Sequence, residues 1–514
     1  MNSFRLPAWF RITRTGRAIS GLFVDYLGST TNAALSFFIT PVLVAILGGP
    51  MYGFWITASQ ILVWLSLLDG GIGANLIKII GAHKDSDPDR VGRAIASTFW
   101  CYATLGGVTL LAGGAMAPFV AGWTHLGGAA AREGTITFVI GIVTSALALV
   151  AVPTFYVILQ GYQKLALVNT LVNGVNIAGA LAGLILVWMH FGIVGLAVGQ
   201  LGGTVVGAAL AWIFARRFCV FSLLPRFVNR AELLEMGRFA AYFTMSKLAF
   251  LGSKYSDTIL IALFYGTAPV AVFSLTQKLA SIAFMFGGKV GPVVVPGLAE
   301  IMGGKDHDTL SSVMLRMISM LTRLALLAAT MIVALNHRFV SLWVGQAMFG
   351  GAMLTVLFAW GVFRDILIRN VSSLLFASGD LEGWGILSLV EAGAKIGLSI
   401  ALLPSLGIIA PILGTAIAEL ITGIYIPVKL RQMLGLQIRT MMAHAAAPAF
   451  LRSLPTIAVA AVLAWLVPME WRWFGIALIG ISGVAANVIV FDAGRIGGFL
   501  QSALHPAISS REGL

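Results

Sequence analysis

The sequence repeats one pattern in residues 170–203, which read TLVNGVNIAGALAGLILVWMHFGIVGLAVGQLGG, and in residues 388–420, which read SLVEAGAKIGLSIALLPSLGIIAPILGTAIAEL. Both stretches begin with Ser/Thr-Leu-Val, break at a Gly-Ile step and continue into a second helix of small residues. Each therefore predicts a pair of apolar helices joined by a sharp break. The copies lie roughly 215 residues apart, which indicates that the chain contains two related halves.

The composition places these helices in a membrane. Hydrophobic residues make up 59% of the 514 positions, charged residues make up 10%, and the mean hydropathy is +0.94. A soluble domain carries about 25% charged residues, so a water-soluble fold is excluded. The abundant glycine (59 residues) suits close packing of helices in lipid. The two cysteines, Cys101 and Cys219, form no metal or disulfide pattern.

Stretches of about 20 apolar residues can cross a bilayer, and the chain has fourteen predicted segments of this kind. They lie near 20–47, 51–80, 92–120, 134–161, 165–190, 192–215, 236–265, 268–300, 310–337, 348–377, 383–404, 406–430, 450–468 and 472–492. Lys and Arg collect in every second loop, whereas the other loops hold only Arg132, Arg338 and Arg472. Because cytoplasmic loops are enriched in these residues, we expect both termini in the cytoplasm.

The repeat and the basic loop after residue 215 together predict the domain organisation. An interfacial segment (1–19) precedes a first six-helix lobe (20–215), a basic linker (216–235) and a second six-helix lobe (236–430). A loop (431–449), two further helices (450–492) and a cytoplasmic tail (493–514) follow. Two halves with an even number of helices are related by an axis along the membrane normal, as in many transporters.

Ionisable residues inside the predicted helices concentrate in the second half. Lys247 and Lys254 are seven positions apart, and Lys278 and Lys289 are eleven apart, so each pair returns to one helix face. Such charges are costly in lipid and usually face a cavity or each other. Several cations on one cavity favour an anionic ligand, above all a phosphate or diphosphate. The predicted substrate-binding residues are Lys247, Lys254, Lys278, Lys289, Arg364, Arg369 and Lys395.

Acidic residues in the same helices are candidates for binding a coupling ion. They are Asp25, Asp257, Glu391 and Glu419. Asp25 could instead pair across the cavity with a lysine of the second half.

Purely structural interpretations remain open for several of these charges. Glu391 could pair with Lys395 one helical turn away, Lys254 and Asp257 could neutralise each other, and Arg369 and Lys289 could extend toward the membrane surface. For Arg364, Lys278 and Lys247, the sequence offers no evident partner in the same helix, so these three are the stronger anion-binding candidates.

Two further stretches resemble a known family. Residues 47–97 carry Gly49, Tyr52, Gly53 and Trp55, followed by a glycine-rich break at 69–73; residues 273–306 carry Pro292 and Pro296 before a short acidic loop. These motifs resemble the polysaccharide transporter family, over about residues 20–430. The resemblance implies the multidrug/oligosaccharidyl-lipid/polysaccharide (MOP) fold, with two lobes around a central cavity. It also implies a flippase for polyprenyl-diphosphate-linked oligosaccharides in the bacterial inner membrane.

The last two helices are similar to those of the lipid II flippases, where they help to form a groove for the lipid tail. The sequence departs from many oligosaccharide flippases because its intramembrane cations lie almost wholly in the second half.

The resemblance implies a lipid-linked oligosaccharide as ligand, with membrane lipids and glycosyltransferases or a polymerase of the same pathway as candidate partners. No nucleic acid, cofactor or metal is expected. The alternatives are a cation-coupled drug exporter of the related MATE branch and a membrane-embedded glycan-processing enzyme. The cationic cavity argues against the exporter. The enzyme is disfavoured because no large polar loop and no nucleotide-binding motif is present, and we expect no catalytic residues.

Overall fold

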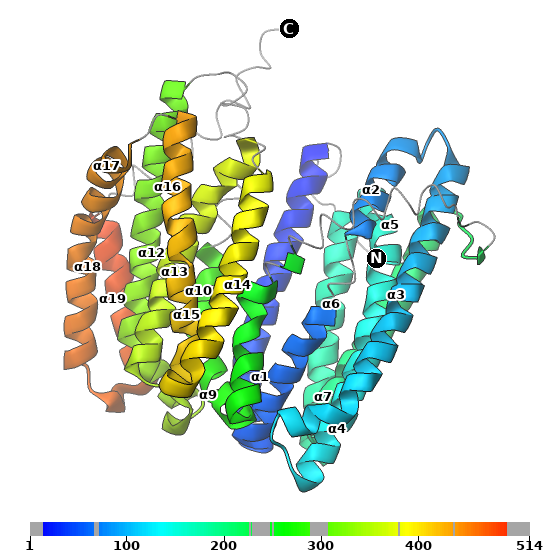
Figure 1. Ribbon diagram of the computed structural model, residues 1–514, viewed down its shortest axis with the longest axis horizontal. Coiled ribbons are helices and arrows are strands. Elements are labelled where there is room, and N and C mark those ends of the chain that lie inside the picture. Colours follow the sequence, from blue (N-terminus) through cyan, green and yellow to red (C-terminus); the bar gives the residue numbers. More distant parts are fainter. Residues whose placement is uncertain are drawn as a thin grey trace, which may run out of the picture. The chain divides into compact units, whose positions relative to one another are not determined.

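The computed structural model describes residues 14–65, 71–225, 228, 247–248, 251–287, 307–378, 381–434 and 437–490, and the regular elements among them are all helices (Figure 1). The prediction of an all-helical chain is therefore confirmed. The chain divides into two compact units, Met1–Ala271 and Val272–Leu514. The expected lobe boundaries at 215 and 236 stay a prediction.

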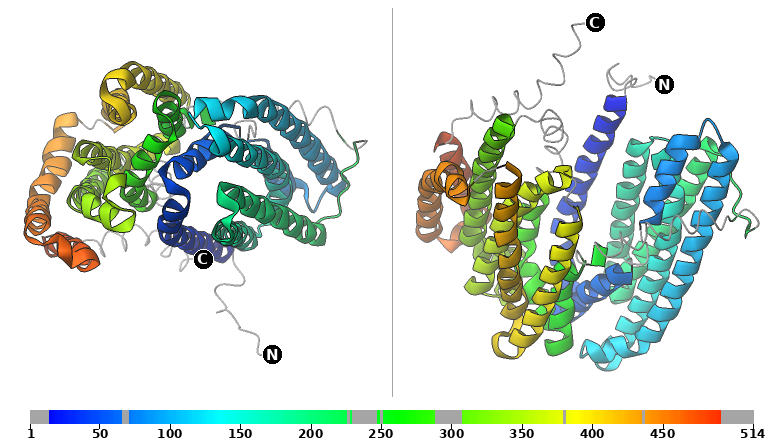
Figure 2. Two further views of the ribbon diagram at one scale, coloured as in Figure 1. Left: turned by 90° about the horizontal axis from the view of Figure 1, so that it is seen from below. Right: turned by 45° about the horizontal axis from the view of Figure 1, so that its top comes forward.

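Unit 1 is a bundle of long helices. It contains α1 (Arg14–Leu65), α2 (Ile72–His83), α3 (Pro88–Trp123), α4 (Gly128–Ala151), η3 (Val152–Tyr156), α5 (Val157–Gly161), α6 (Leu165–Leu186), η4 (Val187–Phe191) and α7 (Gly192–Phe218), followed by a helical segment at 251–265. Helix α3 packs against α4, α4 against α7, and α6 against both α1 and α7. Figure 2 shows these helices from two further directions.

Two glycines bend the first helices. Gly48, with a φ of 74°, kinks α1 between the predicted segments 20–47 and 51–80. Gly71, with a φ of 68°, comes directly before α2. Side chains disfavour this left-handed region of the backbone, so glycine suits both positions. The predicted break at Asp69-Gly70 lies outside the described residues.

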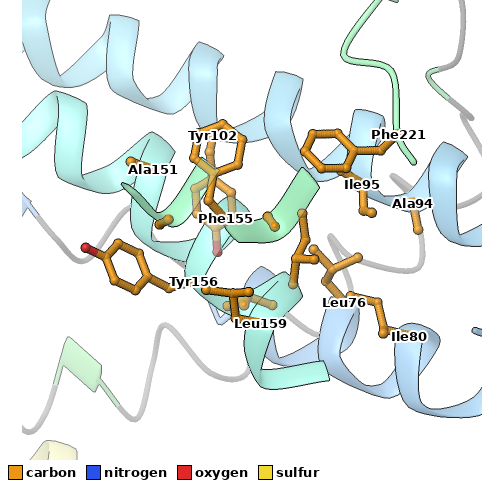
Figure 3. Close-up of a cluster of buried hydrophobic side chains, with 14 of the residues drawn as sticks. Leu76, Ile80, Ala94, Ile95, Tyr102, Ala151, Phe155, Tyr156, Leu159 and Phe221 are labelled. Carbon is orange, nitrogen blue, oxygen red and sulfur yellow. The ribbon is translucent and has the colours of Figure 1, made fainter. Parts of the chain in front are cut away.

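The core of unit 1 lies between α2, α3, η3 and α5. Leu76, Ile80, Ile95 and Leu159 are fully buried there, and Figure 3 shows these side chains close together. The hydroxyl of Tyr102 accepts a hydrogen bond of 2.9 Å from the backbone N–H of Gly73. That N–H belongs to the first turn of α2 and has no acceptor within the helix, so Tyr102 fixes the start of α2 against α3.

Unit 2 is a second helical bundle. It contains α10 (Lys278–Gly287), α12 (His307–Trp343), η6 (Gln346–Met348), α13 (Ala352–Ser378), α14 (Leu381–Leu406), η7 (Gly407–Ile409), α15 (Ala410–Ala418), α16 (Leu420–Leu434), α17 (Ile438–Met441), η8 (Met442–Ala446), α18 (Ala447–Leu466), η9 (Met469–Trp471) and α19 (Arg472–Val490). Helix α9 (Thr267–Thr276) runs across the boundary between the units. Helices α18 and α19 lie beside α12 (Figure 1).

Arg338 attaches the last two helices to α12. It is only 8% exposed and donates hydrogen bonds to the carbonyl oxygens of Ala464 (2.9 Å), Val467 and Pro468 (3.1 Å). The last carbonyls of a helix lack intrahelical partners. A cation at this end is also stabilised by the helix dipole, whose negative end lies there. Arg338 therefore caps α18.

Within the described residues, eight helices are long and apolar enough to cross a membrane, or up to nine if the bent pair α9 and α10 counts as one span. Three continuous stretches, Val24–Leu65, Leu165–Phe218 and Gly385–Gln432, each join two predicted segments across a break. The chain is thus a multi-pass membrane protein. The count of fourteen spans stays a prediction.

Candidate substrate and ion site

Helix α13 carries an arginine into the interior of unit 2. The helix is mostly apolar, although Asp365 follows Arg364 directly, and it packs against α10, α12, α15 and α16. The side chain of Arg364 is 14% exposed. A guanidinium at such a position requires acceptors around it, because an isolated buried charge is energetically costly.

Three carboxylates and one hydroxyl surround Arg364. Its Nη1 lies 2.7 Å from Oε1 of Glu419 and 3.2 Å from Oδ1 of Asp365, and its Nη2 lies 3.4 Å from Oε2 of Glu391. Nη2 also donates a hydrogen bond to the Thr422 hydroxyl. The expectation that Arg364 has no ion-pair partner in its own helix is wrong, because Asp365 is its immediate neighbour.

A lysine completes this group of charges, which we call the Arg364 cluster (Arg364, Asp365, Glu391, Lys395 and Glu419). Lys395 is 2% exposed and lies one turn after Glu391 in α14, and it interacts electrostatically with Glu419. The predicted pairing of Glu391 with Lys395 stays a prediction, whereas the contact of Glu391 with Arg364 is present. Four of the predicted site residues thus meet: Arg364, Lys395, Glu391 and Glu419.

The other predicted cations have different surroundings. Arg369 is exposed and lies over the ring of Phe284, with 5.0 Å between its guanidinium carbon and the ring centroid. Lys254 is exposed on the segment 251–265, where Asp257 is buried. Lys247 is half-buried, and Lys289 lies outside the described residues. Convergence of the lysines with Arg364 stays a prediction.

Lys278 stands at a bend in the backbone. Helices α9 and α10 meet at an angle of 48°, and Lys278 is the first residue of α10. Asn336 donates hydrogen bonds of 3.0 Å to the carbonyl of Thr276 and to the hydroxyl of Thr355. Asn370 donates one of 3.0 Å to the carbonyl of Gly287. Asn336 thus holds the end of α9 next to the bend that positions Lys278, and Asn370 holds the other end of α10.

The corresponding region of unit 1 is less charged. Asp25 is half-buried in α1. Two turns further along the chain, the amide of Asn32 donates a 2.9 Å hydrogen bond to the side-chain oxygen of Asn173 in α6. A neutral amide pair thus joins two helices here, where unit 2 uses ionised groups.

A tight backbone contact and an apolar cavity lie at one end of unit 1. A Cβ atom added to Gly53 would lie 1.8 Å from the carbonyl oxygen of Thr267, so only glycine fits there. The cavity has a volume of about 450 Å³ and lies between α1, α3 and the segment 251–265, with Trp64, Trp123 and Leu263 among its lining residues. The indole N–H of Trp64 has no hydrogen-bond partner within the described part of the chain.

Two members of the site were not predicted as such. Asp365 is recognisable in the sequence as a charged residue. Its position next to Arg364 did not predict a contact, because neighbouring residues of a helix do not face each other. Thr422 carried no signal, because threonines in membrane helices usually bond to their own backbone, as Thr422 also does with Glu419. Among the described residues, no three His, Cys, Asp or Glu side chains are grouped so that they could hold a metal ion.

Comparison with known proteins gives a family match. The model of the polysaccharide biosynthesis protein family matches residues 19–302, which is more than half of the chain. No curated protein matches the sequence.

Solved structures of transporters resemble the chain in fold. The lipid II flippase MurJ in an inward closed conformation matches with a TM-score of 0.71 and 14% identity, over 91% of this chain and 99% of that chain. An inward-facing multidrug resistance MATE family transporter of the MOP superfamily has a TM-score of 0.60 and 16% identity, over 81% and 98%. A MOP superfamily transporter from Pyrococcus furiosus Vc1, whose binding pocket has reverse polarity, has a TM-score of 0.50 and 16% identity, over 83% and 97%.

Proposed function

Since the chain belongs to the polysaccharide biosynthesis protein family, we propose that this MOP-fold membrane protein is a flippase for a polyprenyl-diphosphate-linked oligosaccharide in the inner membrane. The observation that carries the substrate class is Arg364, a guanidinium inside a membrane-spanning bundle, with Lys395 buried beside it. A lipid diphosphate suits such a site because its tail can stay in the bilayer while its charged head passes through the protein.

The proposed division of roles follows the chemistry of the side chains. Arg364 offers a planar fork of donors that matches two phosphate oxygens, whereas a lysine acts as a movable point charge. Lys247, Lys254, Lys278, Lys289, Arg369 and Lys395 would supply such point charges along the path of the head group. Asp25, Asp257, Glu391 and Glu419 would bind the coupling ion.

A transport assay in vesicles tests this proposal. The assay follows a fluorescent short-chain polyprenyl diphosphate oligosaccharide, and compares wild-type protein with Lys278→Ala and Arg364→Lys. We expect partial loss with Arg364→Lys, which keeps the charge but loses the fork, and greater loss with Lys278→Ala. Arg132→Ala is the control, because Arg132 is exposed in unit 1. Wild-type transport by both variants, at equal protein levels, would remove the support for a diphosphate substrate.

Alternating access is the proposed mechanism, and Gly53 offers a test of it. Gly53 belongs to the proposed lobe 20–215 and Thr267 to the proposed lobe 236–430, so their contact would open and close as the lobes move. Gly53→Ala should prevent the close approach of residues 53 and 267. Distances between spin labels placed near these two positions should then shift toward larger values. Gly107→Ala is the matched control, because a Cβ there meets no atom within 4 Å. Identical distance distributions for both variants would contradict the mechanism.

The proposed orientation has both termini in the cytoplasm and can be tested by cysteine labelling. Arg338 is too buried for this purpose, whereas Arg132, Gln346 and Lys164 are exposed. We expect labelling from the periplasm at 132 and 346 and from the cytoplasm at 164. A reversal at any of the three would contradict the proposed topology.

A cation-coupled drug exporter is the second candidate function, because the fold also resembles a MATE transporter and unit 1 holds an apolar cavity. The diphosphate function proposed above assigns Arg364 and Lys395 to an anionic head group rather than to a cationic drug. Accumulation of ethidium in cells with and without the protein separates the two functions, and we expect no difference.

A further inference from the structure

The Arg364 cluster holds more acids than bases. Arg364 and Lys395 contribute two positive charges, and Asp365, Glu391 and Glu419 contribute three negative charges. Within these five groups, carboxylates thus outnumber cations by one. Four of the five side chains are nearly or fully buried, with Asp365 the most exposed at 24%. An ionised carboxylate in such surroundings is costly unless it is paired with a cation or protonated.

The hydrogen bonding of the cluster points to Glu419 as the group that is incompletely satisfied. Oε1 of Glu419 receives a hydrogen bond of 2.7 Å from Arg364. Oε2 of the same carboxylate is buried and has no hydrogen-bond partner within the described residues, and the same holds for Nε of Arg364. An ionised carboxylate can accept several hydrogen bonds, and Oε2 of Glu419 has an open position at which a proton can bind when Arg364 leaves Oε1.

We propose, on the basis of the proposed flippase function, that Arg364 exchanges between Glu419 and the substrate diphosphate, and that Glu419 binds one proton when the diphosphate holds Arg364. The ion pair between Nη1 of Arg364 and Oε1 of Glu419 breaks, and an ion pair with a phosphate oxygen forms. One proton moves from water to Glu419. Arg364 keeps all its protons throughout, since a guanidinium is not deprotonated in proteins.

The surrounding charges determine the direction of the pH effect. Glu419 interacts with Arg364 and Asp365 from α13 and with Glu391 and Lys395 from α14; α12 also packs against α16. Once Arg364 turns to the diphosphate, Glu419 loses its closest cation and stays near two acids, Asp365 and Glu391, and one remaining cation, Lys395. Its proton is then favoured. Low pH therefore strengthens diphosphate binding, and high pH returns Arg364 to Glu419 and releases the ligand.

The exchange also assigns a role to the other two acids. Asp365 follows Arg364 in the chain and keeps its guanidinium in place in both states, while Glu391 at 3.4 Å is the weaker contact. When no ligand is present, Arg364 is thus paired with the carboxylates of the cluster, so that no unpaired cation is buried.

Calorimetric titration of the purified full-length chain tests this inference. The probe is citronellyl diphosphoglucose, a diphosphate diester whose phosphates carry no titrating proton in the neutral range. Heats measured in buffers of different ionisation enthalpy give the protons taken up per bound ligand. We expect up to one proton for wild-type protein, and a dissociation constant that rises about tenfold per pH unit where Glu419 titrates. For Glu419→Gln we expect binding without proton uptake and without pH dependence.

The controls separate this inference from the proposed function. Glu133→Gln removes a carboxylate in unit 1 and should leave proton uptake unchanged, and thermal unfolding of each variant verifies folding. Failure of wild-type protein to bind the probe would contradict the proposed substrate class. Binding without proton uptake, proton uptake that persists in Glu419→Gln, or loss of binding in folded Glu419→Gln would overturn the exchange while the flippase function stands.

Discussion

The helix pair α6 and α7 in unit 1 and the helix pair α14 and α15 in unit 2 share a backbone design. Both break at a glycine in the left-handed region, Gly192 with a φ of 58° and Gly407 with a φ of 57°. The surroundings of the two breaks differ. A carboxylate oxygen of Glu133 accepts a 2.7 Å hydrogen bond from the N–H of Ile193 and so caps α7, whereas a Cβ on Gly407 would meet no atom within 4 Å.

The interiors of the two pairs differ more than their backbones. Three residues after the start of the shared motif, the first copy has Asn173 and the second has Glu391. Asn173 bonds to the neutral Asn32, and Glu391 contacts the cationic Arg364. The comparison teaches that the break recurs in both helix pairs, whereas the contact at the equivalent position is neutral in the pair α6 and α7 and charged in the pair α14 and α15.

The largest expected effect concerns the charged anchoring of unit 2. Arg338→Ala removes three hydrogen bonds to the end of α18 and should lower the unfolding free energy by about 3 kcal/mol, because each is a buried bond from a charged donor. Thermal unfolding in detergent measures the change. Arg132→Ala, the exposed arginine of unit 1, should stay within about 0.5 kcal/mol of wild-type. Equal melting temperatures for both variants would show that unit 2 does not depend on this cation.

A matched pair of alanine substitutions tests the two breaks. Gly192→Ala should cost about 3 kcal/mol, from a strained left-handed residue and from overpacking against Glu133, whose Oε1 would lie 2.0 Å from the new Cβ. Gly407→Ala should cost about 1 kcal/mol from backbone strain alone. Thermal unfolding of both variants gives the difference in stability between them. The double variant Gly192→Ala/Glu133→Ala should recover part of the stability that Gly192→Ala loses. Similar melting temperatures for the single variants would contradict the role of Glu133.

The smallest expected effect on stability comes from the amide pair. Asn173→Ala removes one neutral hydrogen bond and should cost about 1 kcal/mol, with transport close to wild-type. Glu391→Gln at the equivalent position should reduce transport about tenfold, which corresponds to about 1.4 kcal/mol in the barrier. Vesicle transport and melting temperature are measured for both. A transport defect in Asn173→Ala as large as that in Glu391→Gln would remove the functional distinction between the halves.

The helices and their breaks could be predicted because they depend on local sequence. Apolar length marks the spans, and a Gly-Ile step after an apolar run marks positions such as Gly192 and Gly407, where the backbone turns. The bend at Gln277 could not be predicted in this way. It depends on Asn336, about 60 residues away, whose amide holds the carbonyl of Thr276.

The residues of the site could be predicted by type, but their partners could not. Arg364 and Glu419 stand out as charges in apolar helices, yet they are 55 positions apart, and helix periodicity does not say which faces meet. Arg338 illustrates the opposite error. Its position after a predicted span favoured an exposed loop residue, whereas the structure buries it against the end of α18, which only tertiary packing reveals.

The cap at Arg338 also has a consequence for biosynthesis. The carbonyl of Pro468 lies 130 positions after Arg338 in the chain. At a translation rate of about 5–20 residues per second, the arginine waits roughly 7–26 s for its partners after it has left the ribosome. The final packing of α12 is therefore delayed until the last helical hairpin arrives, and a ribosome that stalls before residue 464 leaves a nascent chain in which Arg338 lacks these three carbonyl acceptors.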